Sequence, residues 1–98
     1  MNLYMIKISL PAYLSHELIE LIPAQRAHID KLLQENTVLS YTLAADRSKL
    51  WVVLSAKTAQ EAEKTVSTFP IAEYVQWEIT ELAFHNSVKV ILPTMSLN

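Results

Sequence analysis

The sequence has 98 residues, the length of one domain, and combines 51% apolar residues with only 18% charged ones. Its net charge of −2, without a Lys/Arg cluster, argues against a nucleic-acid partner, and no apolar run approaches the ~20 residues of a membrane-spanning helix. The absence of Cys and Gly excludes disulfides, Fe–S clusters, thiolate zinc sites, P-loops and dinucleotide-binding fingerprints.

The first half of the chain predicts a strand, a helix and a second strand. Residues 3–10 alternate between an apolar and a mixed set of side chains, as in a strand, and Pro11 ends them. Ser15 is a suitable N-cap for a helix that Asn36 can close in the left-handed conformation. Pro23 either kinks this helix or splits off its first turn. Residues 37–44 predict the second strand.

The second half repeats this order of elements. A turn at 45–48 connects to a third strand at 49–55, which is apolar on both faces and suits a central position in a sheet. Thr58 and Glu61 form a capping-box pattern at the start of a second helix, which Pro70 ends. Residues 73–82 alternate again and predict a fourth strand.

The element order is βαββαβ, which predicts an α+β, ferredoxin-like fold with an antiparallel four-stranded sheet. We assign residues 1–86 to this domain and 87–98 to a C-terminal tail. The tail contains a strand-like run at 88–92, which either reaches across to a partner subunit or is disordered. The apolar excess predicts a homodimer or larger oligomer, because obligate interfaces are more apolar than other surfaces. The N-terminus lacks the pattern of a signal peptide, so a cytoplasmic location is expected.

In this topology both helices cover one face of the sheet. We expect that face to hold the apolar sets, although the opposite assignment stays open: Tyr4, Ile6 and Ile8; Leu39, Tyr41 and Leu43; Val75, Trp77 and Ile79. The other face then holds Lys7 and Glu78 as neighbours, because the first and fourth strands are usually adjacent. The polar side chains near this pair are candidate substrate-binding groups: Ser9, Ser40 and Thr42.

The Lys7 and Glu78 pair has two interpretations. One is a cross-strand salt bridge on a solvated face. The other is a catalytic pair in a partly desolvated pocket, where Glu78 moves a proton beside a carbonyl and Lys7 stabilises the enolate charge.

The segment Phe69-Pro70-Ile71, the strand Tyr74-Val75-Gln76-Trp77-Glu78-Ile79 and the following His85 resemble the C-terminal half of muconolactone δ-isomerases. The triplet Ile6-Lys7-Ile8 and the pair Leu10-Pro11 are similar to that family's first strand. The resemblance implies a dimeric α+β barrel with a C-terminal segment exchanged between subunits. It also implies a double-bond shift in a small lactone acid by proton transfer, with no metal or organic cofactor.

By position, the resemblance makes Glu78, Lys7 and His85 the candidate catalytic residues. The chain departs from the family at Ala44-Ala45-Asp46-Arg47-Ser48, where the family has Gly and aromatic or basic residues, so the ligand is expected to differ. His85 is alternatively a turn residue. No pair of the three histidines has the close spacing of a metal site.

Arg26 has two interpretations as well. It lies four residues before Asp30 on the first helix, which favours a surface ion pair, and it is alternatively a ligand for a substrate carboxylate. Two functions therefore stay open after the sequence: a cofactor-free isomerase acting on a small lactone or carboxylate, and a non-catalytic small-ligand-binding or scaffold protein of the same fold.

Overall fold

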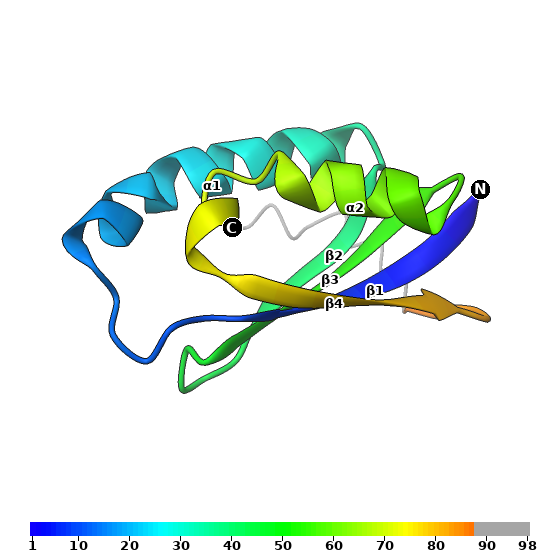
Figure 1. The fold of residues 1–98 in the computed structure, drawn as a ribbon. Helices are drawn as coiled ribbons and strands as arrows, with labels where there is room; N and C mark the ends of the chain where they lie inside the picture. Colours follow the sequence, from blue (N-terminus) through cyan, green and yellow to red (C-terminus); the bar gives the residue numbers. More distant parts are fainter. Residues whose placement is uncertain (88–98) are drawn as a thin grey trace, which may run out of the picture.

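A computed structural model describes residues 1–87 of the protein. Its elements follow the predicted order: β1 (Asn2–Ser9), α1 (His16–Gln34), β2 (Val38–Leu43), β3 (Lys49–Ala56), α2 (Ala59–Ser67), the short 3-10 helix η1 (Ala72–Tyr74) and β4 (Gln76–Leu82). The sheet order is β2-β3-β1-β4 with all neighbours antiparallel. Figure 1 shows both helices on the same side of this sheet. The predicted ferredoxin-like arrangement is therefore confirmed.

The predicted capping residues start both helices. The Ser15 Oγ accepts a hydrogen bond from the Leu18 N–H at 3.1 Å, and the Thr58 Oγ1 accepts one from the Glu61 N–H at 3.1 Å. The Glu61 carboxylate reaches back to the N–H of Lys57 at 2.8 Å, one residue before the expected partner. Each cap satisfies an amide donor that the first helical turn leaves without a backbone acceptor.

The end of α1 takes the conformation that Asn36 was predicted to supply. Asn36 has a φ of 62°, in the left-handed region, and its N–H donates to the Leu33 carbonyl at 3.1 Å. The next N–H, of Thr37, donates to the Leu32 carbonyl at 2.9 Å, which completes a Schellman motif without glycine. Pro23 lies inside a continuous α1, so the alternative in which it splits the helix is wrong.

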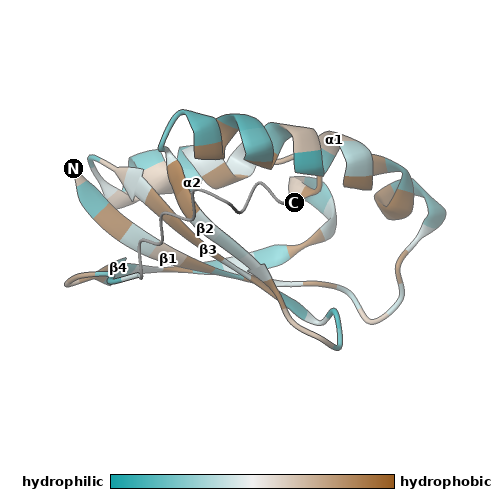
Figure 2. Ribbon diagram, turned by 180° about the vertical axis from the view of Figure 1, so that it is seen from behind, coloured by the Kyte–Doolittle hydropathy of each residue, from teal (hydrophilic) through white to brown (hydrophobic). Residues whose placement is uncertain are grey.

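The core lies between the sheet and the two helices. Tyr4, Ile6 and Ile8 of β1 are at most 2% exposed and belong to it. The helices contribute the remaining apolar layer, chiefly Leu18, Ile29, Leu32, Ala62 and Val66. Figure 2 shows hydrophobic residues along the strands and on the helix sides that face them. The assignment of the apolar set of β1 to the helix-covered face is thus confirmed.

β2 departs from the predicted alternation at one position. Val38 pairs with Leu54 and Ser40 pairs with the next residue of β3, Val53, so Leu39 is the extra residue of a β-bulge. Val38 is therefore buried at 1% exposure, whereas Leu39, which alternation assigned to the core, is 46% exposed. Tyr41 and Leu43 lie beyond the bulge on the helix-covered face, as expected, because their register partners Val52 and Leu50 are core residues. Tyr41 packs against the core, whereas Leu43 is 44% exposed at the end of the strand.

β4 begins three residues later than predicted. The predicted start at residue 73 is wrong because Ala72–Tyr74 form η1, in which the Tyr74 N–H donates to the Ile71 carbonyl at 2.9 Å. Trp77 and Ile79 then pack on the core side, and the Trp77 indole N–H donates to a Glu63 carboxylate oxygen of α2 at 3.2 Å. The sheet edge is thereby attached to the second helix.

The strand-like run at 88–92 lies outside the described residues, and so does nearly all of the predicted tail. Among residues 1–87, the helices lack the continuous apolar stretch that a membrane span requires.

Candidate functional site

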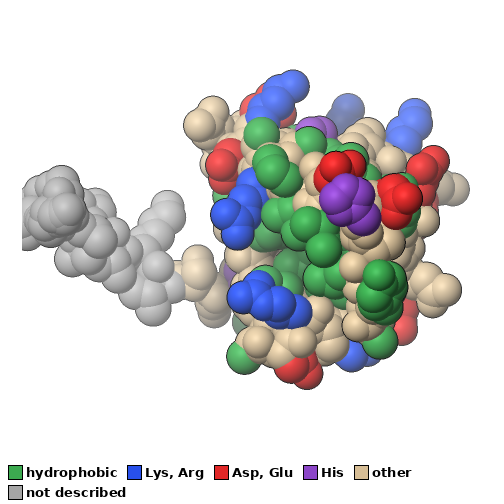
Figure 3. All heavy atoms as spheres, turned by 90° about the vertical axis from the view of Figure 1, so that its left-hand side faces the viewer, with side chains coloured by type: hydrophobic (Ala, Val, Ile, Leu, Met, Phe, Trp, Pro, Cys, Tyr) green, Lys and Arg blue, Asp and Glu red, His purple; other side chains and the backbone are tan. Residues whose placement is uncertain are grey.

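A cavity of about 290 Å³ opens between the first half of α1 and the hairpin end of β2 and β3; we call it the α1 cavity. Its apolar walls come from the loop before α1, from α1, from the hairpin and from the segment after α2: Leu10, Leu14, Leu18, Ile22, Leu43, Leu50 and Ile71. Figure 3 looks onto this end of the molecule and shows hydrophobic side chains gathered at its centre, with Lys or Arg side chains beside them.

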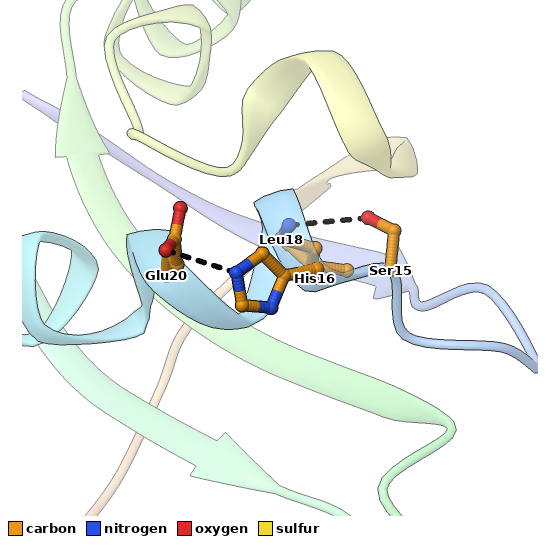
Figure 4. Close-up of polar contacts among 4 residues, drawn as sticks. All are labelled: Ser15, His16, Leu18 and Glu20. Atoms are coloured by element: carbon orange, nitrogen blue, oxygen red, sulfur yellow. Dashed lines mark hydrogen bonds and ion pairs between the residues drawn. The ribbon is translucent and has the colours of Figure 1, made fainter.

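The sequence builds this cavity by separating α1 from the end of β1. Pro11 follows the last strand residues, and the loop that it starts carries Leu14 back toward the sheet before Ser15 caps the helix. Leu18, Ile22 and Gln25 then face the cavity, because positions i, i+4 and i+7 share one side of a helix. Figure 4 shows this capped start of α1, with an exposed contact of 3.1 Å between His16 Nε2 and a Glu20 carboxylate oxygen on its surface.

One polar network crosses the inner wall of the cavity. Gln25 is only 4% exposed, and its Nε2 donates to the Tyr41 hydroxyl at 3.2 Å. Its Oε1 accepts a hydrogen bond from the backbone N–H of Ile71 at 3.3 Å. The amide therefore connects α1 to β2 and to the segment after α2, and both of its polar atoms are satisfied in a buried setting.

The environment of Tyr41 keeps its phenol neutral. Burial raises the pKa of Tyr41 above the ordinary value of 10.0, and the hydrogen bond from Gln25 and the charge of Arg26 oppose this shift only in part. At neutral pH the cavity thus contains a protonated phenol, which is a hydrogen-bond donor.

This pKa shift predicts a loss of stability in alkali. The pKa of Tyr41 is higher in the folded protein than in the unfolded chain. The contribution of Tyr41 to the free energy of unfolding is therefore complete below about pH 10, and it is lost as the pH rises through the folded pKa. Tyr41→Phe should remove this part of the pH dependence when the free energy of unfolding is measured by urea titration. Tyr13→Phe, at a side chain 81% exposed, is the matched control and should keep it. Equal alkaline slopes for wild type and Tyr41→Phe would contradict the assignment.

Two arginines line the cavity from opposite sides. Arg26 comes from α1, and Arg47 comes from the β2–β3 turn, where its φ of 63° is left-handed. Neither forms an ion pair with a carboxylate of residues 1–87. The predicted Arg26–Asp30 pair is therefore wrong within that range, where Lys31 and Glu35 approach to 4.0 Å instead. Arg26 lines the cavity, and its alternative role at a ligand carboxylate stays a prediction.

The other predicted site residues lie on the opposite face of the sheet. Lys7 and Glu78 are direct register partners, as predicted, and Lys7 also pairs with Trp51, whose next neighbour is Thr42. Ile6 and Ile8 point into the core, so Lys7 points away from the helices. Register places the remaining residues Ser9 and Ser40 on this same face. Lys7 is half-buried and Glu78 exposed, and no ion pair joins them in the part of the chain that the structure describes.

His85 lies apart from both groups. It follows the end of β4, where Leu82 pairs with Leu3 near the start of β1, whereas the α1 cavity includes Leu10 beyond the other end of β1. The length of β1 thus separates His85 from the cavity. Among residues 1–87, no three His, Asp or Glu side chains gather closely enough to hold a metal ion.

Sequence reasoning missed Tyr41, Gln25 and Arg47 as site residues. The available signal was Gln25, a polar residue on the buried stripe of α1 that also contains Leu18, Ile29 and Leu32. A buried amide needs partners for both ends, so this position indicated a polar network against the sheet.

No known family profile matches the sequence, and no curated protein is detectably similar to it. Among solved structures, muconolactone isomerase superposes with a TM-score of 0.70 at 19% identity, over 88% of this chain and 93% of that one. The chain has a muconolactone isomerase-like fold. A 5-chloro-2-hydroxyhydroquinone dehydrochlorinase from Burkholderia phenoliruptrix AC1100, in complex with 2,5-dihydroxybenzoquinone, shares it with a TM-score of 0.67 at 16% identity, over 85% of this chain and 95% of that one.

The muconolactone isomerase-like fold was the one predicted from Ile6-Lys7-Ile8, Leu10-Pro11 and the β4 segment, and it is confirmed as a fold. Identities of 16–19% do not carry residue roles from one chain to another. The chemistry of this chain therefore has to be argued from its own cavity, which combines apolar walls, two guanidinium groups and a neutral phenol.

Proposed function

We propose that the protein is a muconolactone isomerase-like enzyme that takes a small lactone or carboxylate into the α1 cavity and moves a proton without a cofactor. The observation that carries the proposal is the cavity itself, which is lined both by two arginines without carboxylate partners among residues 1–87 and by the partly buried Gln25–Tyr41 hydrogen bond. Its volume of about 290 Å³ lies at the small end of ligand pockets and suits a molecule of about one ring.

Each lining group has a distinct role in this proposal. Arg26 and Arg47 bind the carboxylate, because guanidinium groups make charge-assisted, bidentate hydrogen bonds to carboxylates. The Tyr41 hydroxyl donates to the carbonyl oxygen, on which negative charge develops as a proton leaves the neighbouring carbon. The apolar walls reduce contact with water at the inner side of the cavity, where Tyr41 is half-buried, and so strengthen the hydrogen bond that Tyr41 donates. The dehydrochlorinase of the same fold is bound to a one-ring molecule that carries several acceptor oxygens, which supports a ligand of this size.

The catalytic base is the part of the proposal that the cavity does not supply. Among the described residues, no carboxylate or imidazole lines it. For a substrate in the α1 cavity, the proton would therefore pass to a water molecule and return to the substrate at its new position. Glu78 with Lys7 stays the predicted base and electrostatic partner, and this pair can act only on a substrate bound at its own sheet face, which a homodimer would cover. Half-buried Met5 and Trp51 on that face support such a dimer, because they leave apolar area beside the charged pair. Within one chain the sheet lies between this pair and the cavity, so variants of each can be tested separately.

A turnover assay with muconolactone, followed by NMR of the shifting double bond, tests the proposal. Tyr41→Phe should lower kcat by about a hundredfold, as expected for loss of one donor to a developing oxyanion. Glu78→Gln should lower turnover only if the substrate binds at the sheet face, and Glu73→Gln, an exposed carboxylate on η1, should not lower it in either case. A loss of turnover in Glu78→Gln but not in Tyr41→Phe would place the chemistry on the open sheet face.

A second function is favoured by the lack of a base among the described residues that line the cavity. The protein would then bind a small carboxylate without converting it. Binding of muconolactone without turnover, at an affinity that Glu78→Gln leaves unchanged, would identify this non-catalytic function.

A further inference from the structure

Tyr41 and Gln25 form a hydrogen-bond chain whose direction is fixed by chemistry. The backbone N–H of Ile71 can only donate, so the Gln25 atom that faces it at 3.3 Å is the carbonyl oxygen Oε1. The amide nitrogen Nε2 then faces the Tyr41 hydroxyl at 3.2 Å, and because an amide NH₂ only donates, the phenol oxygen is the acceptor. The orientation of one buried amide thus determines the role of Tyr41.

The hydrogen of the Tyr41 hydroxyl is not used in the hydrogen bond to Gln25. Tyr41 lines the α1 cavity, and within residues 1–87 its hydroxyl has no hydrogen-bond partner besides Gln25. A phenol carries one hydrogen, so while the oxygen accepts from Gln25 that hydrogen is free for a ligand.

The remaining polar side chains of the cavity are donors as well. Arg26 and Arg47 have no acceptor atoms, and the Gln25 oxygen is already bonded to Ile71. The side chains therefore offer a ligand several donors, while the Gln25 oxygen is occupied and the Tyr41 oxygen already accepts one hydrogen bond. A ligand group that can only donate, such as an ammonium, would leave two donors facing each other at Tyr41, which is costly in a partly buried site.

We propose that Gln25 is a positioning residue that holds Tyr41 as a hydrogen-bond donor into the α1 cavity, so that the cavity selects small carboxylates with a second acceptor oxygen. That oxygen is a ring or chain carbonyl, or a phenolate. The inference rests on the proposed binding role of the α1 cavity and specifies its ligand class. The carboxylate lies at the arginines and the second acceptor at Tyr41.

A pair of isosteric probes tests this selection. 4-Oxocyclohexanecarboxylate and 4-methylenecyclohexanecarboxylate differ only in whether a C=O or a C=CH₂ occupies the ring position, so they have the same charge and nearly the same shape. By calorimetry, the wild-type protein should bind the ketone about three- to tenfold more tightly, which is the worth of one net hydrogen bond. Tyr41→Phe should reduce this ratio to near one.

Gln25→Glu is the informative variant because glutamate is close to glutamine in shape but reverses the direction of the hydrogen bond between residue 25 and Tyr41. One oxygen of the new carboxylate still accepts from the Ile71 N–H, and the other now accepts the phenol hydrogen of Tyr41, so the ligand loses its donor. The ketone preference should disappear even if both probes bind more weakly. Gln34→Glu, the same substitution at an exposed end of α1, should leave the ratio unchanged.

A second readout does not require a ligand. With tyrosine labelled by ¹³C at Cζ and assigned through Tyr41→Phe, a pH titration should show the pKa of Tyr41 rising further in Gln25→Glu, because a donor to the phenolate is replaced by a negative charge. If the side chain at position 25 did not contact the Tyr41 hydroxyl, this value would change little.

The outcomes separate the two proposals. Equal affinity for both probes in the wild-type protein overturns the selection by Tyr41 while leaving the cavity as a binding site. If neither probe binds, the proposed function and the ligand class both fail. An unchanged Tyr41 titration in a folded Gln25→Glu variant overturns the fixed orientation in either case.

Discussion

Leu54→Ala is expected to lower the free energy of unfolding by about 2–5 kcal/mol, as other truncations of buried leucines do. Leu54 is fully buried on β3, next to the central strand β1, and its register partners are Tyr4 and Val38, which are at most 2% exposed. The removed methyl groups leave a cavity that these neighbours fill only in part. Urea unfolding followed by circular dichroism measures the change.

Leu39→Ala is the matched control, because the same atoms are removed from the neighbouring strand. Leu39 is 46% exposed at the bulge of β2, so its truncation should change the free energy of unfolding by less than about 1 kcal/mol. Similar losses for Leu39→Ala and Leu54→Ala would mean that Leu39 packs in the core, as strict alternation predicts. The described register of β2 would then be wrong.

The double substitution Arg26→Met with Arg47→Met is expected to weaken binding of a small carboxylate by about 10²- to 10⁴-fold, since each charged hydrogen bond is worth about 1.5–3 kcal/mol. Methionine keeps an unbranched apolar stem, so the walls of the α1 cavity should stay largely intact. Calorimetry with 4-oxocyclohexanecarboxylate gives the affinity, and urea unfolding checks that the variant folds.

The control for this variant is Lys57→Met with Lys64→Met, which removes the same net charge near α2. Both lysines are exposed and neither lines the α1 cavity. This pair should change affinity by only a small factor, through long-range electrostatics that salt screens. Equal losses in the two double variants would show that net charge, rather than contact with the arginines, determines binding.

The sequence contained enough local information to predict the fold. Ser15, Asn36 and Thr58 mark helix ends through hydrogen bonds to residues at most four positions away, and the alternation of Tyr4, Ile6 and Ile8 identifies the buried face of β1. These signals act over short range, so they survive without knowledge of the rest of the molecule.

The bulge and the cavity could not be predicted in the same way. Whether Val38 or Leu39 is buried depends on how β2 meets β3, and both residues have equally apolar side chains. The cavity depends on residues from four separate segments. Among these lining residues, the sequence indicated a ligand-binding role only for Arg26. Lys7 and Glu78 are neighbours as predicted, but their alternation pattern alone does not say whether another surface covers them.

An amide NMR titration with 4-oxocyclohexanecarboxylate tests whether a small carboxylate binds in the α1 cavity. Saturable shifts should appear at Gln25, Arg26, Tyr41 and Ile71, which surround one space under α1. Shifts confined to Lys7, Thr42 and Glu78 across the sheet, or no saturable shift at millimolar ligand, would contradict the claim.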